Sequence, residues 1–211
     1  MQQHFDGPAI QQWERFYRSN FINSLTGYKS VSLIGTISNE GLPNLAVFSS
    51  LIHLGSNPAL VGFINRPLAA TQHTMRNIET NGIYTINHIS AAFVKEAHQT
   101  SAKYATGINE FEAVNLDTTF KAGIIAPLVA ASAVKYALQL AEIVPIRQNN
   151  TFLVIGTVTD IFIDSSVVQP DGFLALEAAG TLASLGADAY YTPAPLIRLS
   201  YAKPGQQPAA I

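Results

Sequence analysis

A pair of long alternating segments constrains the fold of this chain more than any other feature of the sequence. Residues 134–141 alternate between larger apolar side chains and small or polar ones, and turn-forming residues follow at 147–150. A stretch rich in β-branched residues then runs from Thr151 to Ile163. Alternation with a period of two places successive side chains on opposite faces of a strand. The pattern therefore predicts a hairpin of two long antiparallel strands.

Shorter strand signals precede this hairpin. Residues 28–38 alternate with one apolar face, which carries Val31, Leu33 and Ile37, and the turn residues 39–41 follow. Further apolar strands are expected at 45–48, 60–64 and 83–87. Between the last two we expect a helix that ends at Asn81-Gly82, and after them a second helix that Ser90 caps and that runs to about Ser101. An open sheet leaves unpaired backbone groups at its edges, and closure into a barrel removes them, so we expect these strands to form a barrel. We predict a mainly β protein with short helices, of the α+β class.

No linker, repeat or composition shift divides the chain. Its 211 residues suffice for one well-buried core, so we expect a single domain over residues 1–211. Residues 1–25 are assigned as an N-terminal extension, and the Pro/Gln/Ala-rich residues 204–211 as a frayed tail. Apolar residues make up 48% of the chain and charged residues only 12%, which leaves a weakly polar surface and favours a homo-oligomer.

Charge and cysteine content exclude several classes of partner and site. The net charge of −2, without any run of Lys or Arg, gives no footprint for nucleic acid. The absence of cysteine excludes disulfides, thiolate metal sites and a cysteine nucleophile. The apolar run 123–134 contains Pro127 and is too short to cross a bilayer, and the first residues lack the pattern of a secretory signal. We expect a cytoplasmic protein without membrane contact.

Familiar catalytic and nucleotide-binding motifs are absent. The sequence contains no G-x-S-x-G, H-E-x-x-H, G-x-x-x-x-G-K or G-x-G-x-x-G pattern, so a Rossmann dinucleotide site is not expected. The five histidines lack the short spacing of metal ligands, and we expect no metal site. No catalytic residue can be named from motifs.

One segment has the features of a phosphate site. A strand ends at Arg66-Pro67, and a helix whose first turn carries Thr74 follows closely. An arginine beside the free N–H groups of a helix start can hold a phosphate. The alternative is structural: Arg66 ends a strand, and Thr71 or Thr74 only caps the helix.

Several segments together resemble one protein family. Asn44-Leu45-Ala46-Val47-Phe48-Ser49-Ser50 resembles the N-L-A-P-[FY]-S segment of the flavin-reductase-like, FMN-binding split-barrel proteins, which include flavoredoxin. Arg66-Pro67 with residues 74–78 is similar to the R-P…D-T-x-x-N-I stretch of that family. Residues 82–87 are similar to its G-E-F-x-x-N strand, and residues 100–112 to its T-S…G-[VI]-x-E-F-E region. The shared order over residues 30–191 makes the match specific, and it implies a split β-barrel.

The resemblance also implies a set of FMN-binding residues. By carry-over, the segment from Asn44 to Ser50 lies beside the flavin ring and ribityl chain, with Ser49 and Ser50 as side-chain donors. Arg66 and Thr74 hold the phosphate, and Asn77 packs the helix start and can reach the same group. Thr100, Ser101 and Phe111 close the far side of the pocket, and core packing is the alternative role for Phe111. The implied cofactor-binding set is Asn44, Leu45, Ala46, Val47, Phe48, Ser49, Ser50, Arg66, Thr74, Asn77, Thr100, Ser101 and Phe111.

The implied activity is hydride transfer from NAD(P)H to bound FMN, in which the cofactor carries the chemistry and the protein supplies positioning. Three residues depart from the family pattern: Val47 replaces a proline, His73 an acidic residue, and Ser184 the arginine of an R-L-G-G…Y segment, whose second glycine is Ala187. With these departures, the sequence supports the prediction of FMN binding better than the prediction of hydride transfer. Two alternatives stay open: a flavoredoxin-like electron carrier without nicotinamide turnover, and a non-catalytic binding module. The resemblance further implies a homodimer, and the sequence does not name a partner monooxygenase.

Overall fold

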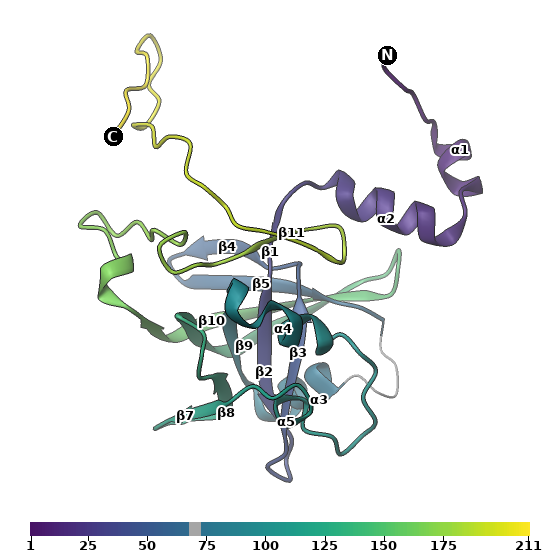
Figure 1. Cartoon of the computed structure of the whole chain (residues 1–211), viewed down its shortest axis with the longest axis vertical. Coiled ribbons are helices and arrows are strands. Elements are labelled where there is room, and N and C mark those ends of the chain that lie inside the picture. Colours follow the sequence, from purple (N-terminus) through teal and green to yellow (C-terminus); the bar gives the residue numbers. More distant parts are fainter. Residues whose placement is uncertain (68–72) are drawn as a thin grey trace.

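A computed structural model describes residues 1–67 and 73–211 of the chain. Its main element is an antiparallel sheet in the order β3-β2-β6-β9-β10-β5-β4 (Figure 1). The strand bounds are β2 Ser32–Ile37, β3 Pro43–Phe48, β4 Ile52–Ser56, β5 Ala59–Asn65, β6 Ile83–His88, β9 Val134–Ile146 and β10 Thr151–Ile163. The mainly β class with short helices is thus confirmed.

The β9–β10 hairpin confirms the strongest prediction from the sequence. The strands pair from Thr151 opposite Ile146 to Ile163 opposite Val134, so β9 continues five residues beyond the alternating segment 134–141. The register shifts between Ile155 and Gly156 and again after Val158. Such irregularities bend a strand and increase its twist. They help the long hairpin curl around the barrel interior.

Side chains close the barrel where its strand ladder is interrupted. β3 stands at one end of the sheet order, and its C-terminal end approaches β5. The Ser50 hydroxyl donates to the carbonyl oxygen of Ile64 at 3.2 Å and accepts from the Ile64 N–H at 3.1 Å. The rings of Phe48 and Phe63 meet edge to face, with centroids 4.9 Å apart. A hydroxyl and an aromatic pair therefore replace strand pairing across this split.

Strand β2 is buried on both faces. Leu33 packs in a cluster with residues of α4 (Val94–Gln99) and α5 (Glu110–Ala113), while Ile34 packs inside the barrel. The sequence suggested one continuous strand over 28–38 with a single apolar face. Instead, a short β1 (Lys29–Ser30) precedes β2, because Lys29 and Ser30 pair with a different sheet.

The two predicted internal helices differ in how they begin and end. α3 spans His73–Asn81, and Gly82, with φ of +67°, donates its N–H to the Ile78 carbonyl at 2.8 Å, as the predicted C-cap requires. The second helix starts as a 3-10 turn, Ala91–Phe93, before α4. Ser90 precedes that turn without a side-chain capping bond, so its expected capping role is wrong.

The remaining elements surround the barrel. A hairpin of β7 (Thr118–Lys121) and β8 (Ile124–Val129) lies beside it, and β1 joins β11 (Ala183–Leu185) and β12 (Ala189–Tyr191) in a small sheet. A 3-10 turn at Ser165–Val167 follows β10. Helices α1 (Gly7–Gln12) and α2 (Arg15–Leu25) and the C-terminal tail project from the barrel on one side (Figure 1), and neither helix buries a residue. Among the described residues, no helix has the length and apolar character of a membrane span.

Candidate functional site

The N-terminal end of β3 is held by a buried hydrogen-bonded cluster. The side-chain N–H groups of Asn44 and Asn77 donate to the Thr36 hydroxyl at 3.1 and 3.0 Å, and Asn44 also donates to the Thr74 hydroxyl at 3.1 Å. All four residues are buried. Three predicted ligand residues, Asn44, Thr74 and Asn77, are thus brought together, and their bonds fasten α3 to the β2–β3 hairpin. The sequence did not reveal Thr36, since a threonine within a strand is an ordinary β-former.

Glu110 provides a second support for the same end of β3. Its carboxylate Oε2 accepts the Leu45 N–H at 3.2 Å, and Oε1 lies 3.9 Å from His73 Nδ1. Nε2 of His73 is 3.3 Å from the Thr106 hydroxyl. Burial raises the pKa of Glu110, and the hydrogen bonds and His73 oppose that rise in part. His73, which replaces an acidic residue of the family pattern, therefore faces an acid contributed by α5.

The C-terminal half of β3 is open. Residues 46–50 are half-buried, whereas Asn44 and Leu45 are buried. Because the Leu45 N–H points away from β2 toward Glu110, the alternation of an antiparallel strand directs the Val47 N–H to the same free edge. Phe48 packs on Phe63, and Ser50 closes the barrel. The open edge thus offers backbone groups between Ala46 and Ser49.

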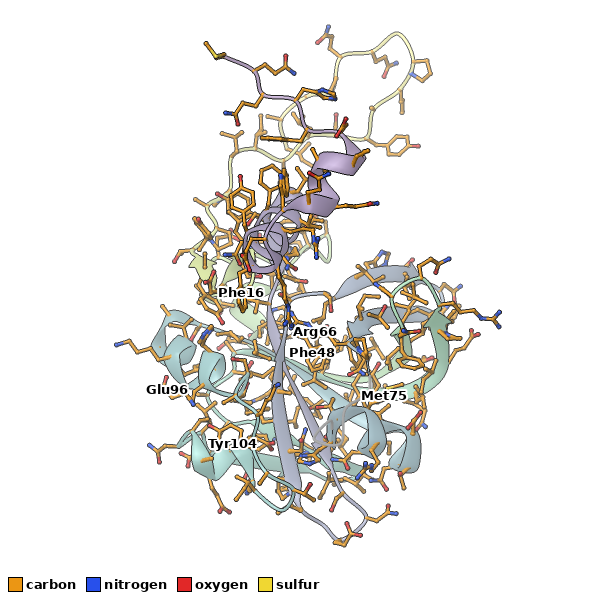
Figure 2. All side chains as sticks on the ribbon, turned by 90° about the vertical axis from the view of Figure 1, so that its right-hand side faces the viewer. Phe16, Phe48, Arg66, Met75, Glu96 and Tyr104 are labelled. Atoms are coloured by element: carbon orange, nitrogen blue, oxygen red, sulfur yellow. The ribbon has the colours of Figure 1, made fainter. Side chains whose placement is uncertain are left out.

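Arg66 lies at the open end of β3. It follows β5 directly, two residues after Ile64, which contacts Ser50, and Figure 2 labels both Arg66 and Phe48. Arg66 is exposed, and its guanidinium has no hydrogen bond or ion pair with residues 1–67 or 73–211. Thr74 meets β3 at Asn44, at the end of the strand opposite to Ser50. Among the described residues, no hydrogen bond joins Arg66 to Thr74, and Thr71 lies outside them.

The predicted far side of the pocket is partly structural. The Thr100 hydroxyl is buried and donates to the Ala97 carbonyl at 2.7 Å, at the end of α4. Phe111 is 1% exposed and packs with Leu45 and Ala97, which is the core role considered as its alternative. Ser101 is exposed. Of these three residues, Ser101 is the one whose side chain is exposed.

Comparison with known proteins defines the family. Residues 28–179 match the model of the flavin reductase like domain. The chain belongs to this family. A flavin reductase candidate with a split barrel domain from Shewanella frigidimarina NCIMB 400 shares 44% identity and superimposes with a TM-score of 0.92, covering 95% of this chain and all of the other. The recognition of the flavin-reductase-like split-barrel family from sequence motifs is thus confirmed.

More distant structures share the fold. Nitrilotriacetate monooxygenase component B from Bacillus cereus superimposes with a TM-score of 0.82 at 17% identity, over 94% of this chain and 99% of the other. Flavoredoxin of Desulfovibrio vulgaris (Miyazaki F) superimposes with a TM-score of 0.69 at 20% identity, over 85% and 92%. At such identities the likeness establishes the split barrel alone.

Proposed function

We propose that this protein binds FMN along the open half of β3 and transfers hydride to it from NAD(P)H, as an NAD(P)H-dependent flavin oxidoreductase. The observation that carries the proposal is the unpaired edge of β3 beside an exposed, unpaired arginine. FMN, when bound, supplies a ring that accepts hydride. Catalytic residues are not assigned, because the residues of this chain bind and orient the reactants.

The open edge of β3 and the exposed residues near it match the hydrogen-bonding groups and the charge of FMN. Backbone groups of residues 46–49 on the free edge of β3 donate to and accept from the flavin, and the Ser49 hydroxyl is placed in the same segment. N–H donors such as that of Val47 favour negative charge on a ligand held beside them. Arg66, which lacks a protein partner among the described residues, binds the phosphate. Ser101 contributes from the end of α4.

The other predicted ligand residues support the site in this proposal. Leu45, Asn44, Thr74 and Asn77 hold the buried end of β3, because the Leu45 N–H, the side-chain N–H groups of the two asparagines and the Thr74 hydroxyl are already bonded within the protein. Ser50 closes the barrel. Thr100 ends α4, and Phe111 fills the core beneath Leu45. Substitution of these residues is expected to lower FMN affinity by destabilising the fold rather than by removing a contact with FMN.

An electron carrier that holds FMN without nicotinamide turnover is the second candidate, and Ser184 favours it. Ser184 stands where the family pattern has an arginine, and it is 3% exposed within β11. Its hydroxyl has no hydrogen-bond partner in residues 1–67 and 73–211. A small buried residue cannot perform the task of a long exposed cation, so any contact that this arginine makes with a reductant is missing. A non-catalytic binding module is the remaining alternative.

The proposal includes a homodimer in the cytoplasm. A second copy is expected to cover the open half of β3, since residues 46–50 are half-buried in one chain and the exposed side chains include Ile52 and Leu54 on β4, the next strand along the chain. The proposal also allows a partner monooxygenase to use the reduced flavin.

An absorption spectrum tests the proposed function directly. The protein is purified without added flavin, FMN is titrated, and NADH or NADPH is then added anaerobically. We expect FMN to bind and to be bleached by one of the two nucleotides. A bound flavin that dithionite alone reduces would identify the electron carrier. Failure to take up FMN would refute both functions.

A further inference from the structure

A polar groove lies on the other side of α3 from the barrel interior. It has a volume of about 480 Å³, which is within the size range of small-molecule sites. Its walls are the β2–β3 turn, α3 and the loop before α5. The lining residues that carry the argument are Glu40, Asn44, His73, Arg76, Asn77 and Ile108.

The floor of the groove presents two anchored hydrogen-bond acceptors. Asn44 and Asn77 are 5% and 7% exposed, and their side-chain N–H groups are fixed on the Thr36 hydroxyl. Within the part of the chain that the structure describes, neither amide oxygen has a donor. The fully buried side-chain atoms without partners are those of Tyr84 and Ser184. The two amide oxygens are therefore open toward the groove, held in place by bonds on the opposite side of each amide.

The rim combines a cation with an apolar wall. Arg76 is exposed on α3, and its guanidinium makes no ion pair with residues 1–67 or 73–211. His73 lies one helical turn earlier, and its two ring nitrogens already face the Glu110 carboxylate and the Thr106 hydroxyl. Ile108, which is 42% exposed, lines the groove together with Leu42 and Pro43, and these three side chains supply its apolar wall. Glu40, on the turn, disfavours an anion at its end of the groove, and the Glu110 carboxylate beside His73 disfavours one there, so the anionic part of a ligand belongs beside Arg76.

Acceptors, a cation and an apolar wall together match a nucleoside phosphate. Amino and ribose hydroxyl groups donate to amide oxygens, a base lies on an apolar wall, and a phosphate pairs with arginine. We infer that this groove binds the adenosine phosphate half of NAD(P)H. This inference rests on the proposed function, and it gives the nicotinamide dinucleotide a site in a chain without a Rossmann motif.

The position of the groove fits this assignment. Asn44 lines the groove and is also a residue of β3, whose next residues form the open edge proposed for FMN. A dinucleotide held by its adenosine half in the groove can therefore extend along β3 toward the flavin. Arg66, the proposed partner of the FMN phosphate, lies at the other end of β3, so the two phosphate-binding groups are separate.

Titration of adenosine phosphates into the FMN-loaded protein tests the inference. Adenosine 2′,5′-bisphosphate and 5′-AMP are followed by calorimetry with the parent protein, with Arg76→Ala and with the control Arg147→Ala in the β9–β10 turn. We expect Arg76→Ala to lower the affinity for adenosine 2′,5′-bisphosphate by roughly tenfold or more and to leave FMN affinity unchanged. Arg147→Ala is expected to behave like the parent.

Turnover with a truncated reductant provides the second readout. Arg76→Ala is expected to raise the KM for NADPH while leaving the rate with 1-methyl-1,4-dihydronicotinamide, which lacks the adenosine half, as in the parent. Adenosine phosphates that do not bind the FMN-loaded protein would overturn the inference and leave FMN binding intact. If Arg76→Ala lowers the affinity for FMN as much as the affinity for adenosine 2′,5′-bisphosphate, the groove would instead be assigned to the FMN phosphate. If FMN itself fails to bind, the proposed function fails, and titration of the flavin-free protein still decides whether the groove takes adenosine phosphates.

Discussion

The two halves of β3 differ in whether their polar groups are already bonded. At the N-terminal half, Asn44 bonds to Thr36 and Thr74, and the Leu45 N–H bonds to Glu110. At the C-terminal half, the Val47 edge and the neighbouring Arg66 have no such partners among the described residues. A segment that matches a family motif can therefore contain both structural supports and residues left free for a ligand. Substitutions in the first half should change stability, and those in the second should change FMN affinity.

The largest effect is expected from Thr36→Val at the bonded end. This change removes the acceptor of two buried amide donors, so the free energy of unfolding should fall by roughly 2–4 kcal/mol. Urea unfolding measures the loss. Thr159→Val, on an exposed position of β10, is the matched control and should change stability by less than about 0.5 kcal/mol. Equal effects of the two changes would show that the Thr36 cluster does not hold α3 and β3 together.

The free energy of unfolding is expected to depend on pH through His88, which lies in the sheet near the open half of β3. His88 on β6 lies opposite Ser32, which also pairs with Phe48, and burial lowers the pKa of His88 to about 4 from its ordinary value of 6.5. As the pH falls below 6.5, the unfolded chain binds a proton that the folded chain does not. Stability should therefore decrease between about pH 6.5 and pH 4, by at most roughly 3 kcal/mol.

The variant His88→Gln isolates that contribution. Its free energy of unfolding should vary less with pH in this window than that of the parent, as measured by urea unfolding at several pH values. His53→Gln, at an exposed position of β4, should keep the pH profile of the parent. A His88→Gln profile that runs parallel to the parent would assign the acid sensitivity to other groups.

Arg66→Ala tests the open end. FMN affinity should fall by roughly 10- to 100-fold because the charged phosphate loses its partner, and riboflavin affinity should stay the same. Flavin fluorescence quenching measures both. The free energy of unfolding should change by less than about 0.5 kcal/mol, and Lys95→Ala, an exposed change on α4, is the control for net charge. Equal losses for FMN and riboflavin would make Arg66 a structural residue.

The smallest effect is expected from Tyr84→Phe in the barrel interior that supports Phe48. The Tyr84 hydroxyl is buried without a partner, and its ring packs 5.8 Å from that of Phe63. A side chain at Gly156 would overlap this hydroxyl, so the space around it is filled. Removing an unbonded buried hydroxyl should leave stability unchanged or raise it by up to about 1 kcal/mol. A measured loss of more than that would mean that the hydroxyl finds a partner in solution.

Much of the fold could be predicted because the strand signals are local. The period-two pattern of residues 134–141 and 151–163 requires only neighbouring residues, and Gly82 ends its helix through its own backbone freedom. The single-face assignment of residues 28–38 was incomplete, since burial of β2 on both sides depends on α4 and α5, which come later in the chain. The 3-10 start of the second helix likewise had no signal at Ser90.

For the candidate site, the sequence by itself determined the family and the segment: the ordered motifs from Asn44 to Glu112 identified a flavin-reductase-like split barrel. Tertiary structure alone decided which polar residues in those motifs are free. Thr74 and Asn77 carry the residue types of ligands, yet their partners Asn44 and Thr36 lie 30 and 41 residues away in the chain. A hydrogen bond depends on where the folded chain places its donor and acceptor, so the sequence shows which groups can bond and the fold determines which ones remain for a ligand.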